Sequence, residues 1–116
     1  MKTPALLLLA AVILSGCATT KKPLVYYYGG YEQAYYHSKK DNTPDSVAKY
    51  KLALEDVIRT SERKGLRVPP GIYCEYGYLL SKQGSADAER YFNLEVATYP
   101  ESAHFVAFLK TQIKQN

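Results

Sequence analysis

Several residue types are scarce in this sequence of 116 residues, which has no Trp, one Met, two His and two Cys. His37 and His104 lie far apart and outside any metal-binding or G-x-S-x-G pattern, so we predict no metal site, cofactor or hydrolase triad. The unbroken apolar run Ala5–Leu14 has only about half of the roughly 20 residues that cross a bilayer as a helix. No stretch alternates strictly between apolar and polar residues, so half-buried strands are not predicted.

The overall composition is that of one ordinary folded domain, with 47% apolar and 22% charged residues. This composition and length exclude a multidomain enzyme, a coiled coil, a collagen-like chain and a wholly disordered tail. The net charge is +4 and the basic residues are mixed with acidic ones along the chain, so nucleic acid is not an expected partner. The pair Lys39-Lys40 is expected to be solvated surface. What stands out is an excess of Tyr, with twelve residues.

The N-terminus has the features of a secretory signal peptide. A positive start at Lys2 precedes the apolar run, and the small residues Ser15 and Gly16 follow it. We therefore expect residues 1–16 to be removed on export.

The four residues that end this segment resemble the lipobox of bacterial lipoproteins; they are Leu14, Ser15, Gly16 and Cys17. The resemblance implies that Cys17 is diacylated on sulfur, for example with palmitate, and becomes the first residue of the mature protein. Two or three acyl chains give stable membrane anchoring, where one chain holds only marginally. Since Ala18 rather than Asp follows the Cys, the resemblance implies the periplasmic face of the outer membrane, and residues 17–24 are expected to form the lipidated start and a short tether.

If Cys17 carries lipid, Cys74 has no partner for an intramolecular disulfide. Cys74 lies among bulky residues of an expected helix, where a small buried side chain is the favoured interpretation. A reactive thiol or a disulfide between chains is the alternative.

The rest of the chain, residues 25–116, shows apolar residues at helical spacing and predicts a single all-α domain. A first helix is expected to contain Tyr27, Tyr28, Tyr31, Ala34 and Tyr35. A second should begin with Thr43 as N-cap and Pro44 as first residue and end at Gly65. Further helices are expected from about Pro70 to Gln83, from a Ser85 cap to Tyr99, and through an apolar stripe made up of Phe105, Val106, Leu109 and Ile113. Four to five helices joined by short connections predict a fold of antiparallel helical hairpins.

The third and fourth expected helices resemble a degenerate tetratricopeptide repeat (TPR), with the turn one residue short. The matching residues are Tyr73, Tyr76, Gly77, Leu80, Gly84, Ala88, Phe92 and Pro100. Because Gly inside a helix costs about 1 kcal/mol relative to Ala, Gly77 predicts a close approach of two helices, with Ala88 facing it.

The whole domain also resembles the DUF4810 family of small bacterial lipoproteins. The residues that carry this resemblance are Leu24-Val25-Tyr26, Gly30-Tyr31, Val68-Pro69-Pro70-Gly71, Glu75-Tyr76-Gly77-Tyr78-Leu79-Leu80, Gly84, Ala88, Tyr91-Phe92, Glu95 and Tyr99-Pro100-Glu101-Ser102. Cys74 stands where a small residue such as Ala is expected, and Tyr28 where Trp is expected. The family has no established catalytic activity, and its genes accompany those of a CsgG-like outer-membrane lipoprotein. The resemblance implies an accessory of an envelope assembly or secretion complex and supplies no site.

The tyrosines near the start of the domain are the candidate partner-binding residues; they are Tyr26, Tyr27, Tyr28, Tyr31, Tyr35 and Tyr36. Three consecutive side chains point in different directions, so at least one of the first three should be exposed. Tyr is enriched at interface hot spots, and we expect this cluster to dock a protein. The other tyrosines are expected to fill helix interfaces with their hydroxyls at the rim.

Among the acidic residues, Glu75 is the one candidate for chemistry, because it lies among aromatic residues. It could be a catalytic carboxylate of raised pKa, but a structural hydrogen bond to a Tyr hydroxyl is favoured. We therefore expect no enzyme and no small-molecule substrate. The sequence favours an outer-membrane lipoprotein that acts as a protein–protein adaptor, with a lipoprotein that contacts peptidoglycan as the alternative.

Overall fold

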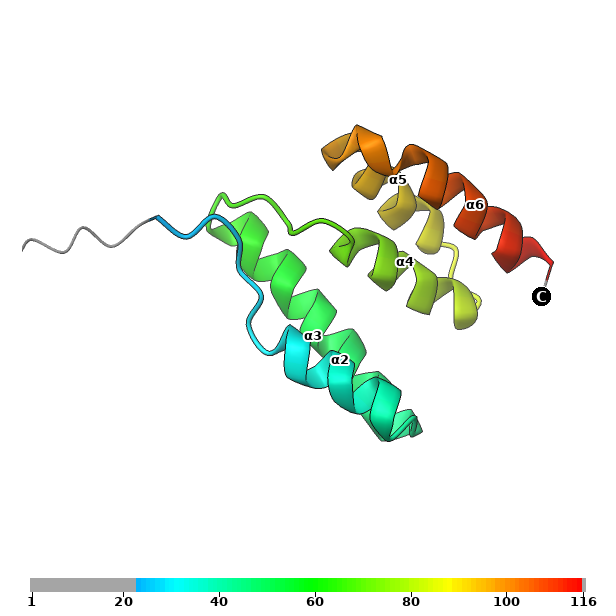
Figure 1. Ribbon diagram of the computed structural model, residues 1–116, viewed down its shortest axis with the longest axis horizontal. Helices are drawn as coiled ribbons and strands as arrows, with labels where there is room; N and C mark the ends of the chain where they lie inside the picture. Colours follow the sequence, from blue (N-terminus) through cyan, green and yellow to red (C-terminus); the bar gives the residue numbers. More distant parts are fainter. Residues whose placement is uncertain (1–22, 116) are drawn as a thin grey trace, which may run out of the picture.

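The computed structural model describes residues 23–115, and within them the fold is helical and without strands (Figure 1). The all-α prediction is therefore confirmed. The elements are α2 (Tyr31–Lys40), α3 (Pro44–Arg63), α4 (Ile72–Lys82), α5 (Ala88–Thr98), the short 3-10 helix η1 (Pro100–Ser102) and α6 (Ala103–Lys114). None of these helices combines the length and apolar character needed to cross a membrane. The predicted signal peptide and lipobox, with Cys17, lie outside the described residues.

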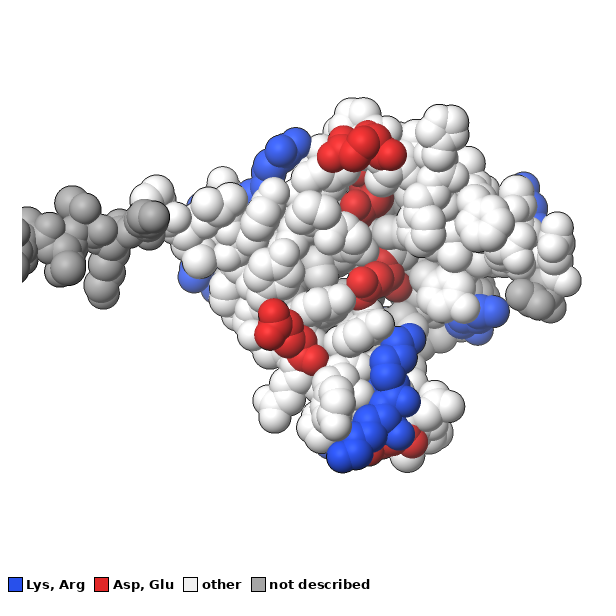
Figure 2. Space-filling view, in the orientation of Figure 1, with Lys and Arg blue, Asp and Glu red and all other residues white. Residues whose placement is uncertain are grey.

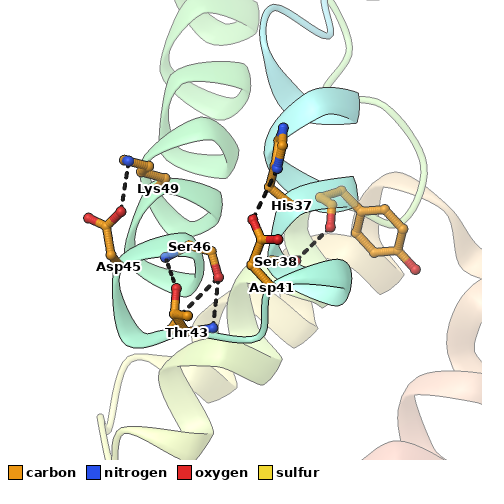
Figure 3. Close-up of polar contacts among 8 residues, drawn as sticks. His37, Ser38, Asp41, Thr43, Asp45, Ser46 and Lys49 are labelled. Atoms are coloured by element: carbon orange, nitrogen blue, oxygen red, sulfur yellow. Dashed lines mark hydrogen bonds and ion pairs between the residues drawn. The ribbon is translucent and has the colours of Figure 1, made fainter.

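Helices α2 and α3 pack side by side across a short turn, and α3 begins at a complete N-cap (Figure 3). The Thr43 hydroxyl accepts the Ser46 N–H at 3.1 Å, and the Ser46 hydroxyl accepts the Thr43 N–H at 3.0 Å. This reciprocal capping box satisfies two backbone donors that the first turn would otherwise leave without partners. Pro44 needs no partner, and Asp45 pairs with Lys49 at 2.7 Å on the exposed side. The predicted start of this helix is confirmed.

The core lies where α3, α4, α5 and α6 meet. Helix α3 contributes Leu54 and Val57, both fully buried, and α4 contributes Ile72, which is 1% exposed. Gly65 ends the α3 segment with φ of 64°, a conformation that Gly adopts without the steric cost of a Cβ. Helix α6 closes the stack through Val106, which is 2% exposed.

Helices α4 and α5 pack closely against each other at Gly77. A Cβ placed on Gly77 would lie 3.1 Å from the Ala88 carbonyl oxygen and 3.1 Å from the Phe92 ring. The absence of a side chain at Gly77 therefore lets the two helices approach each other, as its position in the sequence predicts.

Three sequence-based expectations were wrong in detail. Helix α2 begins only at Tyr31, because Gly29 adopts φ of 51° and turns the chain, so Tyr27 and Tyr28 precede the helix. Ser85 does not cap α5: this helix begins at Ala88, and the Ser85 hydroxyl instead accepts the Asp87 N–H at 3.3 Å in the preceding turn.

The third difference is Phe105, which was expected on the apolar face of the last helix. Its side chain is 60% exposed, whereas Val106 beside it is buried. The buried face of α6 is narrower than the apolar stripe of its sequence, so an aromatic ring is left at the surface.

Candidate functional site

A hollow of about 350 Å³ lies along α4, between the α2–α3 pair and α6. It is lined by Tyr35 and Lys39 of α2, Tyr50 of α3, Cys74, Glu75, Tyr78, Leu79 and Lys82 of α4, and Phe105, Leu109, Gln112 and Ile113 of α6. Most of the lining thus comes from α2, α4 and α6, which alternate with α3 and α5 along the chain.

A second hollow of about 410 Å³ continues the first toward the N-terminus of α4. The two share Cys74, Glu75 and Phe105. The second is lined in addition by Pro70, Gly71, Glu95, Tyr99, Glu101 and Ser102. Because they share these lining residues, the two hollows adjoin, and we call them together the α4 groove.

Glu75 lies where the two hollows meet and accepts hydrogen bonds from two phenols. The Tyr31 hydroxyl lies 3.0 Å and 2.9 Å from its two carboxylate oxygens, and the Tyr50 hydroxyl also donates to Oε2. Burial, together with the negative charge of Glu75, raises the pKa of both phenols well above the ordinary value of 10, so they stay protonated as donors. The favoured prediction of a structural Tyr–Glu75 hydrogen bond is confirmed.

Glu95 is the most deeply buried acidic residue of the described chain, at 2% exposure. Its carboxylate accepts the backbone N–H of Gly71 at 2.8 Å and that of Cys74 at 3.2 Å. Both donors belong to the first turn of α4, where the helix dipole favours a negative charge. Glu95 therefore takes the place of an N-cap side chain, which Gly71 cannot supply, and fixes the start of the helix that forms the groove floor.

Cys74 is buried beside these two carboxylates, as the favoured interpretation predicted, with 4% exposure. Burial, then the charges of Glu95 and Glu75, raises the pKa of its thiol to about 11. Since the thiolate is the reactive form, this environment makes Cys74 a poor nucleophile at neutral pH.

Lys39 and Lys82 lie at one end of the groove, and Glu101 lies at the other. The ammonium of Lys39 lies 5.4 Å from the centroid of the Tyr35 ring, and that of Lys82 lies 5.4 Å from the Tyr78 ring. Figure 2 shows the resulting pattern, with acidic side chains in a row down the centre of the face and basic ones gathered over the lower end of α2. Lys39 is exposed, as was expected of the Lys39-Lys40 pair, but no periodicity in the sequence signals that it lines the same hollow as Lys82.

The six candidate tyrosines do not form one surface. Tyr28, Tyr31 and Tyr35 follow one another in ring contact, at centroid distances of 6.2 Å and 5.9 Å. Tyr28 is 40% exposed, in agreement with the expectation of an exposed ring among Tyr26–Tyr28, and Tyr35 is 41% exposed. This chain of rings leads into the α4 groove through Tyr35.

Of the remaining candidates, Tyr26 extends this chain of rings, whereas Tyr27 and Tyr36 have other neighbours. Tyr26 contacts Tyr28 edge to face at 6.3 Å, and Tyr27 donates a hydrogen bond of 2.9 Å to Asp56 of α3. That hydrogen bond lowers the pKa of Asp56 below its ordinary value. Tyr36 is 56% exposed and contacts the ring of His37.

Other tyrosines fill helix interfaces with their hydroxyls on polar partners, as predicted. Tyr73 donates to Glu62 at 3.0 Å, Tyr76 to Glu55 at 2.8 Å, and Tyr99 to the Val68 carbonyl at 2.7 Å. Much of the Tyr excess thus connects carboxylates and carbonyls at the edge of the core.

The described residues contain no group of three or more His, Cys, Asp or Glu side chains placed to hold a metal ion. What the geometry offers is an open groove with aromatic rims and separated charges, which suits non-covalent binding.

Residues 25–109 match the family described as a domain of unknown function, DUF4810. No curated protein and no solved structure matches the chain significantly. Because the match covers most of the sequence, the chain belongs to the DUF4810 family.

Proposed function

We propose that this protein is a lipoprotein held at the periplasmic face of the outer membrane by fatty acids on Cys17, and that its helical domain is a protein–protein adaptor. The adaptor would serve an envelope assembly or secretion complex, with a CsgG-like lipoprotein as the partner suggested by the family resemblance. In this proposal the helices are TPR-like hairpins, and α2, α4 and α6 line the inner face of the stack.

One observation carries the proposal: aromatic side chains stand exposed around the α4 groove. Tyr35 is 41% exposed, Tyr78 37% and Phe105 60%. Tyr is enriched among the residues that dominate binding energy in protein interfaces, so exposed tyrosines beside a hollow favour a docking surface. The polar groups in the groove support binding over catalysis, because Glu75 already accepts two phenols and the Cys74 thiol stays protonated.

Crosslinking in intact cells tests the proposal, with a photoreactive amino acid in place of Phe105. We expect crosslinks to one or a few envelope proteins, and the additional substitution Tyr35→Ser should reduce their yield at least tenfold, since loss of a hot-spot ring costs about 2 kcal/mol. The same probe at Leu52 is the control, because Leu52 is 64% exposed on α3 but does not line the groove.

A Cys17→Ser variant should leave the membrane fraction and lose the crosslinks. Crosslinks that are equal from Phe105 and Leu52 would contradict an adaptor groove. Recovery of the chain on purified peptidoglycan, with no protein crosslinks, would favour the structural alternative.

A further inference from the structure

We propose that the α4 groove binds an extended segment of a partner protein in one direction, with a basic side chain at the Glu75–Glu101 end and an acidic side chain or terminal carboxylate at the Lys39–Lys82 end. Apolar side chains of the segment lie between these charges. This inference rests on the proposed adaptor function and specifies the chemistry of the partner.

The shape of the groove favours a chain segment over a small molecule. Small-molecule sites enclose most of their ligand, whereas here the rims are exposed, Phe105 to 60% and Tyr35 to 41%. Helix α4 has 11 residues and is therefore about 16 Å long at 1.5 Å per residue. An extended peptide rises about 3.3 Å per residue, so roughly five residues would span the groove.

The end of the groove near the start of α4 has an excess of negative charge. Glu75, Glu95 and Glu101 all line it. Glu75 and Glu95 accept hydrogen bonds from neutral phenol and backbone groups, and within residues 23–115 none of the three carboxylates forms an ion pair with a basic side chain. A Lys or Arg of a partner would supply the missing positive charge.

The opposite end carries positive charge. Lys39 and Lys82 come from α2 and α4 and line the same hollow. Each ammonium lies over a tyrosine ring, and neither pairs with a carboxylate in the part of the chain that the structure describes. Both ammonium groups therefore belong to the same end of the groove, where an acidic group of a bound segment would meet positive charge.

Between the two ends the lining is apolar and aromatic. Tyr78 and Leu79 of α4 face this part of the groove together with Phe105 and Leu109 of α6. Apolar contact there would provide affinity, while the charges at the ends would fix the direction of the segment, since electrostatic complementarity sets register and selects partners.

Selection from a random peptide library tests this inference, with the full chain purified in detergent as the target. We expect the enriched peptides to share a single charge order. They should carry a basic residue, then two or three apolar residues, then an acidic residue or the free C-terminus, or all of them should carry the reverse order, but not a mixture of the two. An enriched peptide should bind at least about tenfold more tightly than a peptide with its two charged residues exchanged, since the exchange places like charges together at both ends of the groove.

The charge-reversal variant Lys39→Glu/Lys82→Glu should change what is selected. Peptides enriched on it should carry basic residues at both ends of the apolar stretch. The control is Lys49→Glu/Arg59→Glu, which makes the same change in charge at two exposed residues that do not line the groove. It should select the same peptides as the natural chain, and circular dichroism should show equal helix content in all three proteins.

The inference is overturned if no peptide is enriched, if the enriched peptides have no charge order, or if both double variants select alike. These results are distinguishable from failure of the adaptor function. Crosslinks from Phe105 together with peptides of no charge order would retain the adaptor function and reject the directed groove. Peptides with a shared charge order but no crosslinks in cells would retain the directed groove and reject the adaptor function.

Discussion

At the scale of single residues, Gly77 shows two opposing effects whose sizes can be compared. Ala in place of Gly inside a helix should stabilise the chain by about 1 kcal/mol. The added Cβ, however, would lie 3.1 Å from both the Ala88 carbonyl oxygen and the Phe92 ring. Phe92 is 3% exposed and cannot turn away, and overpacking of this kind costs about 1–3 kcal/mol. The net loss is about 0–2 kcal/mol, and because the Cβ would crowd a backbone oxygen and a buried ring at once, we expect Gly77→Ala to lower the free energy of unfolding by an amount in the upper half of that range, measured by urea denaturation.

Gly30→Ala is the matched control, because nothing lies within 4 Å of a Cβ at that position and its φ is −90°. Its effect should stay below about 1 kcal/mol. A Gly77→Ala variant as stable as the natural chain would show that the α4–α5 contact yields easily, and Gly77 would then have no structural role.

The comparison of Glu75 with Glu95 shows what residue patterns can reveal. Glu75 could be singled out from the sequence because aromatic residues flank it, and its bonds to tyrosines follow from that setting. Glu95 is more deeply buried, but its partners are backbone N–H groups 24 and 21 residues away. Periodicity assigns a carboxylate to a polar face, and only the packing of α5 against the start of α4 explains its burial.

At the scale of helices, the start of α3 is the boundary that local chemistry determines most completely. Thr43 and Ser46 exchange two hydrogen bonds (Figure 3), and loss of such a cap costs about 1 kcal/mol. Thr43→Ala should therefore lower the free energy of unfolding by about that amount in urea denaturation, while Thr43→Ser, which keeps the hydroxyl, should change it by much less. Equal losses in both variants would mean that the methyl group of Thr43, not its hydroxyl, matters.

Helix boundaries were predictable where a cap or a terminating Gly acts locally, and less so where the chain turns for other reasons. Tyr27 and Tyr28 have the spacing of a helix face, but Gly29 breaks the helix and frees Tyr27 to bond Asp56 of α3. Exposure of Phe105 likewise depends on how much of α6 its neighbours cover. The α4 groove joins residues of five α-helices and of η1, so its lysines and carboxylates could not be grouped from sequence spacing.

At the scale of the whole molecule, the tyrosines link the pieces of the fold through hydrogen bonds that require protonated phenols. Tyr31 and Tyr50 connect α2 and α3 to α4 through Glu75. Tyr73 and Tyr76 connect α4 back to α3 through Glu62 and Glu55. The α2–α3 wall of the groove and its floor are thus held together by the same type of interaction.

This shared dependence predicts a loss of stability in alkaline solution. Burial, then the hydrogen bond to Glu62, raises the pKa of Tyr73 from its ordinary value of 10.0 to about 12, and the pKa values of Tyr31, Tyr50 and Tyr76 are raised as well. Unfolded phenols lose their protons near pH 10, whereas the folded ones keep theirs. The unfolded state therefore binds fewer protons above about pH 10, and the free energy of unfolding falls as the pH rises.

We expect urea denaturation midpoints to decrease steeply above about pH 10, with phenolate absorbance and loss of helical circular dichroism changing together. Tyr73→Phe should make the decrease shallower, because that ring no longer titrates on unfolding. Tyr36→Phe is the control, since this ring is 56% exposed and outside the core. If phenolate absorbance instead rose fully while helix content was retained, the buried tyrosines would ionise in the folded state, and their bonds to carboxylates could not hold the helices together.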